Sequence, residues 1–365
     1  FIKRKQYPTT IKIRSKSTYP YLYIGLFVFL IGLVFWYWVM QSSGGILNAL
    51  ISLGTGRQNL FRVGGSTIPF EISKHFLSAG IFLISSFFFL KKKVLFAWAT
   101  TISLFVLLLT FGGRGLAMAA IISGLIAHNY LYKRIHLRTL VILFAVSLPL
   151  LIFLKDARRL LDGETELRDV DFLSAFQIQS ESGIQDTLVD LSYVSHAFDY
   201  DMAFHYSYFE KNKDFFLGEY ILGLGMILPR AVFPNKGNTL SNKLSEEIWC
   251  DGIGCKIDVG ISPSMVTSAA AYWTYFAFPV LCFFIGYCGM LFWHQTVRVI
   301  NTPISLMVYS LGWPYVFTLF NDLNSFIASV LPILFTYFFV KILYEFPWSV
   351  LFMTPKESKD VLKHV

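Results

Sequence analysis

Long apolar runs alternate with polar connections along most of this chain of 365 residues. Eight of the runs have 16 to 22 residues, close to the roughly 20 that an α-helix needs to cross the hydrocarbon core of a bilayer. The pattern predicts an all-α, polytopic membrane protein with about eight transmembrane helices in a single integral membrane domain, residues 1–365. The predicted spans are residues 21–40, 72–90, 94–111, 116–132, 139–154, 272–293, 303–320 and 325–343.

The connections between these runs are unequal in length. The second and third runs are joined by a short lysine turn, and the third and fourth by the turn "GGRG". In contrast, residues 155–271 form one large segment between the fifth and sixth runs, and a loop that long inside a compact unit is usually functional. Apolar residues at helical spacing between Leu188 and Met202 predict a long amphipathic helix in it, so we expect a partly helical loop.

Composition agrees with a membrane protein. Hydrophobic residues make up 55% of the chain and charged residues only 15%, whereas a soluble domain has roughly a quarter of its residues charged. The net charge of +8 is of the kind that suggests nucleic acid as the partner of a soluble protein. Here the basic residues gather in the connections, so we expect membrane lipid and no nucleic acid.

The distribution of charge predicts the orientation. Residues 1–20 contain six Lys or Arg and no acid, and further basic residues follow the second run (residues 91–93) and the fourth run (residues 133–138). Of the 23 acidic residues, 18 fall in residues 155–271. Since cytoplasmic loops are enriched in Lys and Arg, we expect both termini in the cytoplasm and residues 155–271 as a periplasmic loop.

One arginine lies in a glycine turn between two apolar runs. The stretch "LTFGGRGLAM" places Arg114 on the predicted outer side. An arginine near the bilayer is costly and usually has a partner, the glycines allow close approach to the backbone, and the start of a helix attracts anions. We therefore interpret Arg114 as an anion-binding residue. The competing interpretation is an interfacial anchor whose side chain reaches the headgroups.

Three more cations lie on the predicted outer side. In "LPRAVFPNKG", Arg230 and Lys236 are six residues apart in an apolar setting that two prolines make rigid. Arg57 follows an amphipathic stretch, residues 46–53, that we expect to lie along the membrane surface. Arginine offers a planar fork and lysine a point charge, so this set suits phosphate binding. The alternative for the proline segment is a structured loop with incidental charges.

Candidate bases lie in the amphipathic part of the large loop. The stretch "SHAFDYDMAFHYSYFE" contains His196, Asp199, Asp201 and His205. Each of them is a possible general base, and each is equally consistent with a hydrogen-bonded surface group. The sequence alone does not choose among them.

Two cysteines lie in the same loop. Cys250 and Cys255 enclose a glycine-bearing turn in "WCDGIGCKID", and an oxidising exterior predicts a local disulfide between them. A metal pair is the alternative, but no matching His/Cys pair stands nearby. The chain has no Walker motif, no HExxH and no nucleophile elbow, so we expect neither ATP hydrolysis nor zinc proteolysis.

Three stretches resemble the Wzy-type O-antigen (oligosaccharide repeat-unit) polymerases, which are relatives of the O-antigen ligases. They are "GGRG" between two spans, "FLGEYILGLGMILPRAVFPNKG" in the large loop, and "GISPSMVTSAAAYWTYFAFPV" before the next span. The resemblance extends over residues 20–345 in architecture, and its specific motifs cover about 60 residues. It implies a GT-C-like membrane glycosyltransferase in the bacterial inner membrane, with its active site facing the periplasm.

The resemblance also implies a reaction. Such enzymes transfer a growing glycan from undecaprenyl pyrophosphate onto the next lipid-linked repeat unit, and a chain-length regulator is an expected partner. Arg114, Arg230, Lys236 and Arg57 would neutralise the pyrophosphate, and one of the candidate bases would activate the acceptor hydroxyl. The implied mechanism needs no metal and no cofactor. A ligase that moves the glycan to another acceptor, or a flippase for lipid-linked oligosaccharides, are the alternative functions.

Overall fold

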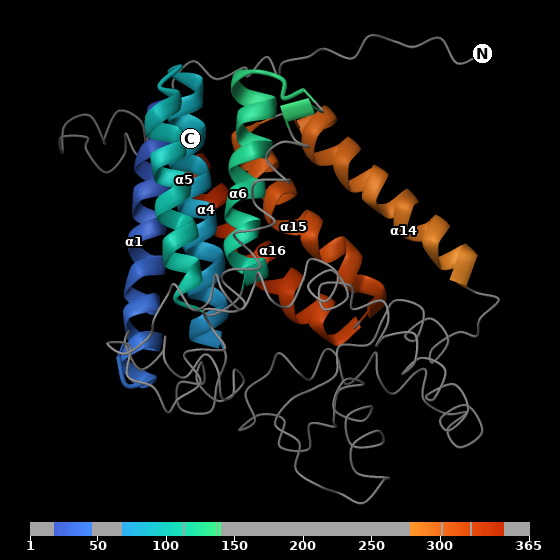
Figure 1. The fold of residues 1–365 in the computed structure, drawn as a ribbon, viewed down its shortest axis with the longest axis horizontal. Helices are drawn as coiled ribbons and strands as arrows, with labels where there is room; N and C mark the ends of the chain where they lie inside the picture. The colour runs from blue at the N-terminus through green and yellow to red at the C-terminus, as the bar shows by residue number, and fades with distance from the viewer. Residues whose placement is uncertain are drawn as a thin grey trace, which may run out of the picture.

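The protein is a bundle of long helices in the computed structural model (Figure 1). The structure describes residues 18–45, 68–111, 114–136, 138–139, 278–300, 302–321 and 323–346. Every regular element in these ranges is helical, which confirms the predicted all-α class for this part of the chain. The elements are α1 (Tyr19–Ser42), α4 (Ile68–Leu90), α5 (Val94–Leu109), α6 (Arg114–Ala127), η1 (His128–Tyr132), α14 (Phe278–Trp293), η3 (His294–Ile300), α15 (Pro303–Asn321) and α16 (Leu323–Glu345).

Seven of the eight predicted spans overlap these helices, although the first part of the span 272–293, residues 272–277, lies outside the described residues. The predicted span 139–154 lies outside the described residues except at Thr139. Two helices, α1 and α4, are long and apolar enough to cross a membrane, and α5 and residues 117–132 are shorter apolar helices. The count of eight spans and the GT-C-like arrangement therefore stay predictions, as does the course of residues 155–271, which lie outside the described residues.

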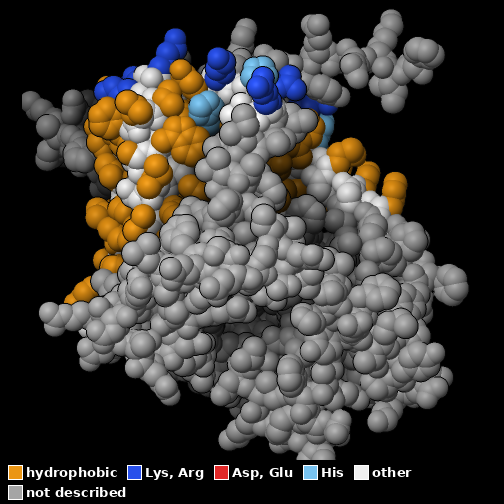
Figure 2. All heavy atoms as spheres, viewed as in Figure 1, with side chains coloured by type: hydrophobic (Ala, Val, Ile, Leu, Met, Phe, Trp, Pro, Cys, Tyr) orange, Lys and Arg blue, Asp and Glu red, His pale blue; other side chains and the backbone are white. Residues whose placement is uncertain are grey.

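The helices α1, α4, α5 and α6 run alternately in opposite directions, and so do α14, α15 and α16, so their connections lie at two ends of the bundle (Figure 1). One end carries the turn between α4 and α5, the end of η1 and the end of α16, and we call it the lysine end. Figure 2 shows Lys and Arg gathered there. The opposite end carries the end of α1 and the starts of α4, α6 and α16, and we call it the Arg114 end. The basic residues of the lysine end include Lys91, Lys92, Lys93, Lys133, Arg134, Arg138, Arg298 and Lys341.

Glycines bring α1 and α4 into backbone contact. A Cβ added at Gly80 of α4 would lie 2.6 Å from the backbone nitrogen of Phe29 and 2.8 Å from the carbonyl oxygen of Gly25, both in α1. A Cβ added at Gly32 would lie 2.7 Å from the backbone nitrogen of Leu77. Small residues allow this close approach, so the pair forms a tight antiparallel seam.

The seam makes α4 the central helix of the described bundle. It packs against α1, α5, α6, α15 and α16, and most of its side chains are buried. The helices α1, α5, α14 and α16 expose large apolar side chains, and Figure 2 shows such side chains over the side of the bundle that α1 and α5 form. On α1 the exposed set is Tyr19, Tyr23, Leu26, Phe27, Leu30, Val34, Tyr37 and Trp38. An apolar surface of this extent on a soluble protein would be unusual.

Candidate functional site

Arg114 is the first residue of α6. The preceding helix, α5, ends at Leu109, and Thr110 and Phe111 continue it as a hydrogen-bonded turn. The structure thus places the backbone of Arg114 at a helix start, as the sequence predicts, although α6 begins two residues before the predicted span. The first turn of a helix has N–H groups without helical partners, and these favour anions.

Two contacts fix the position of this turn relative to α1 and α4. The indole Nε1 of Trp36 in α1 donates a hydrogen bond to the hydroxyl of Thr110, at 2.9 Å. The ring of Phe111 packs edge-on against the ring of Phe70 in α4, with centroids 4.9 Å apart. The chain just before Arg114 is therefore held against the first turn of α4.

The first two turns of α4 carry a charged cluster made of Glu71, Lys74 and His75. The Oε2 atom of Glu71 lies 2.6 Å from Nζ of Lys74 and 3.3 Å from Nε2 of His75. The i, i+3 and i, i+4 spacing puts the three side chains on one side of the helix. Because helical side chains lean toward the helix N-terminus, Lys74 and His75 reach back to Glu71 and toward the Arg114 end.

The cluster is buried. The side chains of Lys74 and His75 are 8% and 3% exposed, and that of Glu71 is 24% exposed. The ammonium of Lys74 also lies over the ring of Phe70, 5.3 Å from its centroid. Since Phe70 contacts Phe111, one continuous set of contacts joins Lys74 to the turn that precedes Arg114.

A buried charged cluster in an apolar helix needs a reason. Desolvation of two opposite charges roughly cancels their attraction, so such a pair adds little to stability on balance. Ionisable groups inside membrane helices usually mark a binding or transport site. The cluster supplies an ammonium for an anion, a carboxylate as acceptor, and an imidazole beside the carboxylate.

The apolar pattern of the sequence does not single out these three residues. It places Glu71 at the end of the first outer connection, and Lys74 and His75 inside the predicted span 72–90. The signal was present, because "FEISKH" spaces three ionisable residues by three and four positions at the head of an apolar run. The structure starts α4 at Ile68, which brings Glu71 into the helix and completes the cluster.

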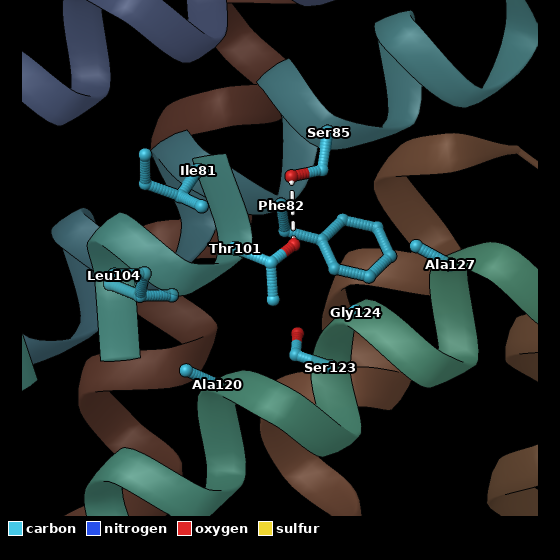
Figure 3. Close-up of a pocket in the computed structure, with 9 residues that line it drawn as sticks. All are labelled: Ile81, Phe82, Ser85, Thr101, Leu104, Ala120, Ser123, Gly124 and Ala127. Atoms are coloured by element: carbon cyan, nitrogen blue, oxygen red, sulfur yellow. Dashed lines mark hydrogen bonds between the residues drawn. The ribbon is translucent and has the colours of Figure 1, made fainter. Parts of the chain in front are cut away.

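The polar side of α4 continues toward the lysine end. Ser78, one turn beyond Lys74, donates a hydrogen bond to the Lys74 carbonyl, and two turns further on Ser85 lies 3.2 Å from the hydroxyl of Thr101 in α5 (Figure 3). Helical spacing puts Glu71, Lys74, Ser78 and Ser85 on one stripe. The stripe faces α5 at Ser85, where the hydroxyls meet.

Ser85 and Thr101 border a small cavity between α4, α5 and α6 (Figure 3). Its volume of about 10 Å³ is close to the minimum that holds one water molecule. The hydroxyls around it already have partners: Thr101 donates to the Ala97 carbonyl, and Ser123 pairs with Ser310 of α15 at 2.9 Å. The cavity is therefore a packing feature and is too small for a substrate. Its lining residues are Ile81, Phe82, Ser85, Thr101, Leu104, Ala120, Ser123, Gly124 and Ala127.

Most site residues predicted from the sequence lie outside the described residues. This applies to the candidate bases, to three of the four predicted pyrophosphate ligands, and to the predicted disulfide. They are His196, Asp199, Asp201, His205, Arg57, Arg230, Lys236, Cys250 and Cys255. Arg114 is the predicted site residue that the structure describes, as the first residue of α6.

Comparison of the chain with protein-family models, with curated protein sequences and with solved structures finds no match. The fold and the buried cluster nevertheless define the kind of protein in physical terms. The described part is a helical protein with two helices long and apolar enough to cross a membrane, and a buried charged cluster lies at the end of the bundle where α6 begins.

Proposed function

We propose that the protein is a multi-pass protein of the bacterial inner membrane with both termini in the cytoplasm. Three observations support this proposal. The helices α1 and α4 are long and apolar enough to cross a bilayer, the peripheral helices expose large apolar side chains, and one end of the described bundle is rich in lysine and arginine (Figure 2). Because positive residues favour the cytoplasmic side, the Arg114 end would face the periplasm.

We further propose that the protein is a glycosyltransferase that polymerises undecaprenyl-pyrophosphate-linked oligosaccharide repeat units. The observation that carries this proposal is the buried cluster of Glu71, Lys74 and His75, which contacts through Phe70 connect to the turn before α6. A buried cation at the same end of the bundle as a helix start with an arginine suits a membrane-held anion. A lipid diphosphate is such an anion, and the resemblance of the sequence motifs names the same chemical class.

The proposed reaction is a displacement at a sugar carbon. A hydroxyl of the acceptor unit attacks C1 of the first sugar of the growing glycan. The C1–O bond to the pyrophosphate breaks, undecaprenyl pyrophosphate leaves with the electron pair, and the hydroxyl proton passes to a base. Neutralising the leaving diphosphate lowers the barrier electrostatically. We propose Arg114, Arg230, Lys236 and Arg57 for this role, and we expect no metal.

Replacing Arg114 tests the proposal directly. We expect Arg114→Ala to reduce chain extension at least a hundredfold, since loss of one preorganised donor to a developing anion costs about that much. The measurement is the length distribution of the glycan formed from lipid-linked repeat units by purified protein. Arg134→Ala is the matched control, because Arg134 is an exposed arginine at the lysine end, and it should extend chains normally.

The products also separate polymerase from ligase. A polymerase makes glycan ladders from lipid-linked units alone, whereas a ligase needs a different acceptor and leaves long lipid-linked chains when it is absent. Ladders of normal length from the Arg114→Ala variant would refute the role of Arg114. If transfer requires an acceptor that carries no lipid diphosphate, the protein is a ligase and the proposal of a polymerase is wrong.

A further inference from the structure

The ion pair between Lys74 and Glu71 differs from the other Lys–Glu pair of the described helices. On α16, Lys341 and Glu345 are 3.8 Å apart and their side chains are 44% and 64% exposed. That pair is an ordinary surface pair, which contributes little. Lys74 and Glu71 are 2.6 Å apart, and the lysine is almost wholly buried.

The position of Lys74 allows it to meet an anion that comes from the Arg114 end. Lys74 is six residues, or about 9 Å, from the start of α4, and its four-carbon side chain leans toward that start. Its ammonium is covered by Phe70, which contacts Phe111 at the turn before Arg114. The ammonium and the start of α6 therefore lie at the same end of the bundle, and the contact between Phe70 and Phe111 connects the cluster to the chain just before α6.

Glu71 offers the same kind of bond that a phosphate would. A carboxylate and a phosphate both accept short, charge-assisted hydrogen bonds from an ammonium. Glu71 is also the outermost and the most exposed member of the cluster. An anion arriving from the Arg114 end therefore meets Glu71 first and competes with it for Lys74.

We infer that Lys74 binds the diphosphate of a lipid-linked substrate, and that Glu71 is its internal counter-ion while the site is empty. The inference rests on the proposed function. It adds Lys74 as a ligand of the diphosphate, and it adds competition between Glu71 and the diphosphate for the Lys74 ammonium. Glu71 keeps the buried ammonium neutralised without ligand. When the diphosphate arrives, it takes the ammonium from Glu71, whose carboxylate remains beside His75.

The competition predicts opposite effects for the two members of the pair. Lys74→Gln removes a charged contact to the ligand, and such contacts correspond to about tenfold or more in affinity. Glu71→Gln removes the competing carboxylate and leaves an ammonium without it, so the diphosphate should bind several-fold more tightly. A purely structural ion pair would weaken binding in both variants.

The experiment measures binding of undecaprenyl diphosphate to the purified full chain in lipid nanodiscs. We expect the Kd to rise about tenfold or more in Lys74→Gln, to fall in Glu71→Gln, and to stay unchanged in the matched control Lys341→Gln. The double variant Glu71→Gln/Lys74→Gln, which leaves no lone buried charge from this pair, should bind as weakly as Lys74→Gln. It replaces the single lysine variant if that variant does not fold.

Each result decides the inference. Wild-type affinity in Lys74→Gln or in the double variant would overturn it, as would weaker binding in Glu71→Gln. Absence of binding to the wild-type protein would also overturn it. The assay does not depend on transfer, so Lys74-dependent binding without chain extension would refute the polymerase and leave the binding site. Chain extension together with binding that does not depend on Lys74 would support the polymerase and refute the binding role of Lys74.

Discussion

Lys92 closes α4 in a conformation that an L-residue seldom adopts. Its φ is 59°, and the N–H groups of Lys92 and Lys93 bond back to the carbonyls of Phe89 and Phe88, at 3.0 and 2.8 Å. This pair of backbone hydrogen bonds is a common way to end a helix, and glycine is favoured at the left-handed position. A lysine there gives up backbone stability and adds a positive charge at the lysine end.

Lys92→Gly should therefore stabilise the protein. The left-handed conformation costs a non-glycine residue about 1–2 kcal/mol. Glycine removes this cost but recovers only part of it as stability, because its greater freedom in the unfolded chain opposes folding. We expect a gain of about 0.5–1 kcal/mol, measured as a higher thermal unfolding temperature in detergent. Lys91→Gly is the control: Lys91 has no positive φ, and this change should not stabilise. A lower unfolding temperature for Lys92→Gly would contradict the assignment of strain.

At the scale of residues, the sequence predicts the turn around Arg114 better than it predicts the cluster of Glu71, Lys74 and His75. Arg114 stands out because glycines surround it, and the structure places it at a helix start. Lys74 and His75 do not stand out in a search for apolar runs, since two ionisable residues barely lower the average over a span. Their closeness to Glu71 depends on where α4 begins, and helix boundaries are the least certain result of a sequence-based prediction.

At the scale of elements, the seam between α1 and α4 depends on glycines. Gly80 lies against the backbone of Gly25 and Phe29, where no side chain can yield. Gly286 in α14 is a different case, because a Cβ added there meets nothing within 4 Å. The two residues make a matched pair of helical glycines, one in a close contact and one in open space.

Alanine substitutions should separate these two glycines. Gly80→Ala forces the two helices apart, and overpacking of this kind costs about 1–3 kcal/mol or more. Gly286→Ala should be neutral or stabilising by up to about 1 kcal/mol, because alanine is the better helix former. Thermal unfolding of both variants in detergent is the measurement. An equal effect of the two changes would argue against the backbone contact at the seam.

Apolar runs predict the helices well, because a helix that faces lipid or other helices needs a nearly continuous apolar surface. They do not predict which helix is central. The seam glycines Gly25, Gly32 and Gly80 are scattered singly in the sequence, and only the pairing of α1 with α4 brings them together. The π-helical turns η1 and η3 at the ends of α6 and α14 leave no such mark in the apolar pattern.

At the scale of the whole molecule, the two ends of the bundle predict a topology. The α4–α5 turn belongs to the lysine end and the end of α1 to the Arg114 end. Alkaline phosphatase fused after Gly45 should be active, because this enzyme needs disulfides that form outside the cytoplasm. The same enzyme fused after Lys93 should be inactive. The opposite pattern would reverse the orientation, and equal activity at both positions would contradict the crossing of α4.

The burial of α4 has a consequence for how the protein is made. Its first two turns carry Glu71, Lys74 and His75, and the transfer of such ionisable side chains from the translocon into lipid has an unfavourable free energy. The helix α1 is more apolar than α4, is synthesised before it, and presents the glycines onto which α4 docks. We therefore expect α1 to act as an intramolecular chaperone that receives α4 as it leaves the translocon, so that the charged turns enter the membrane already facing protein.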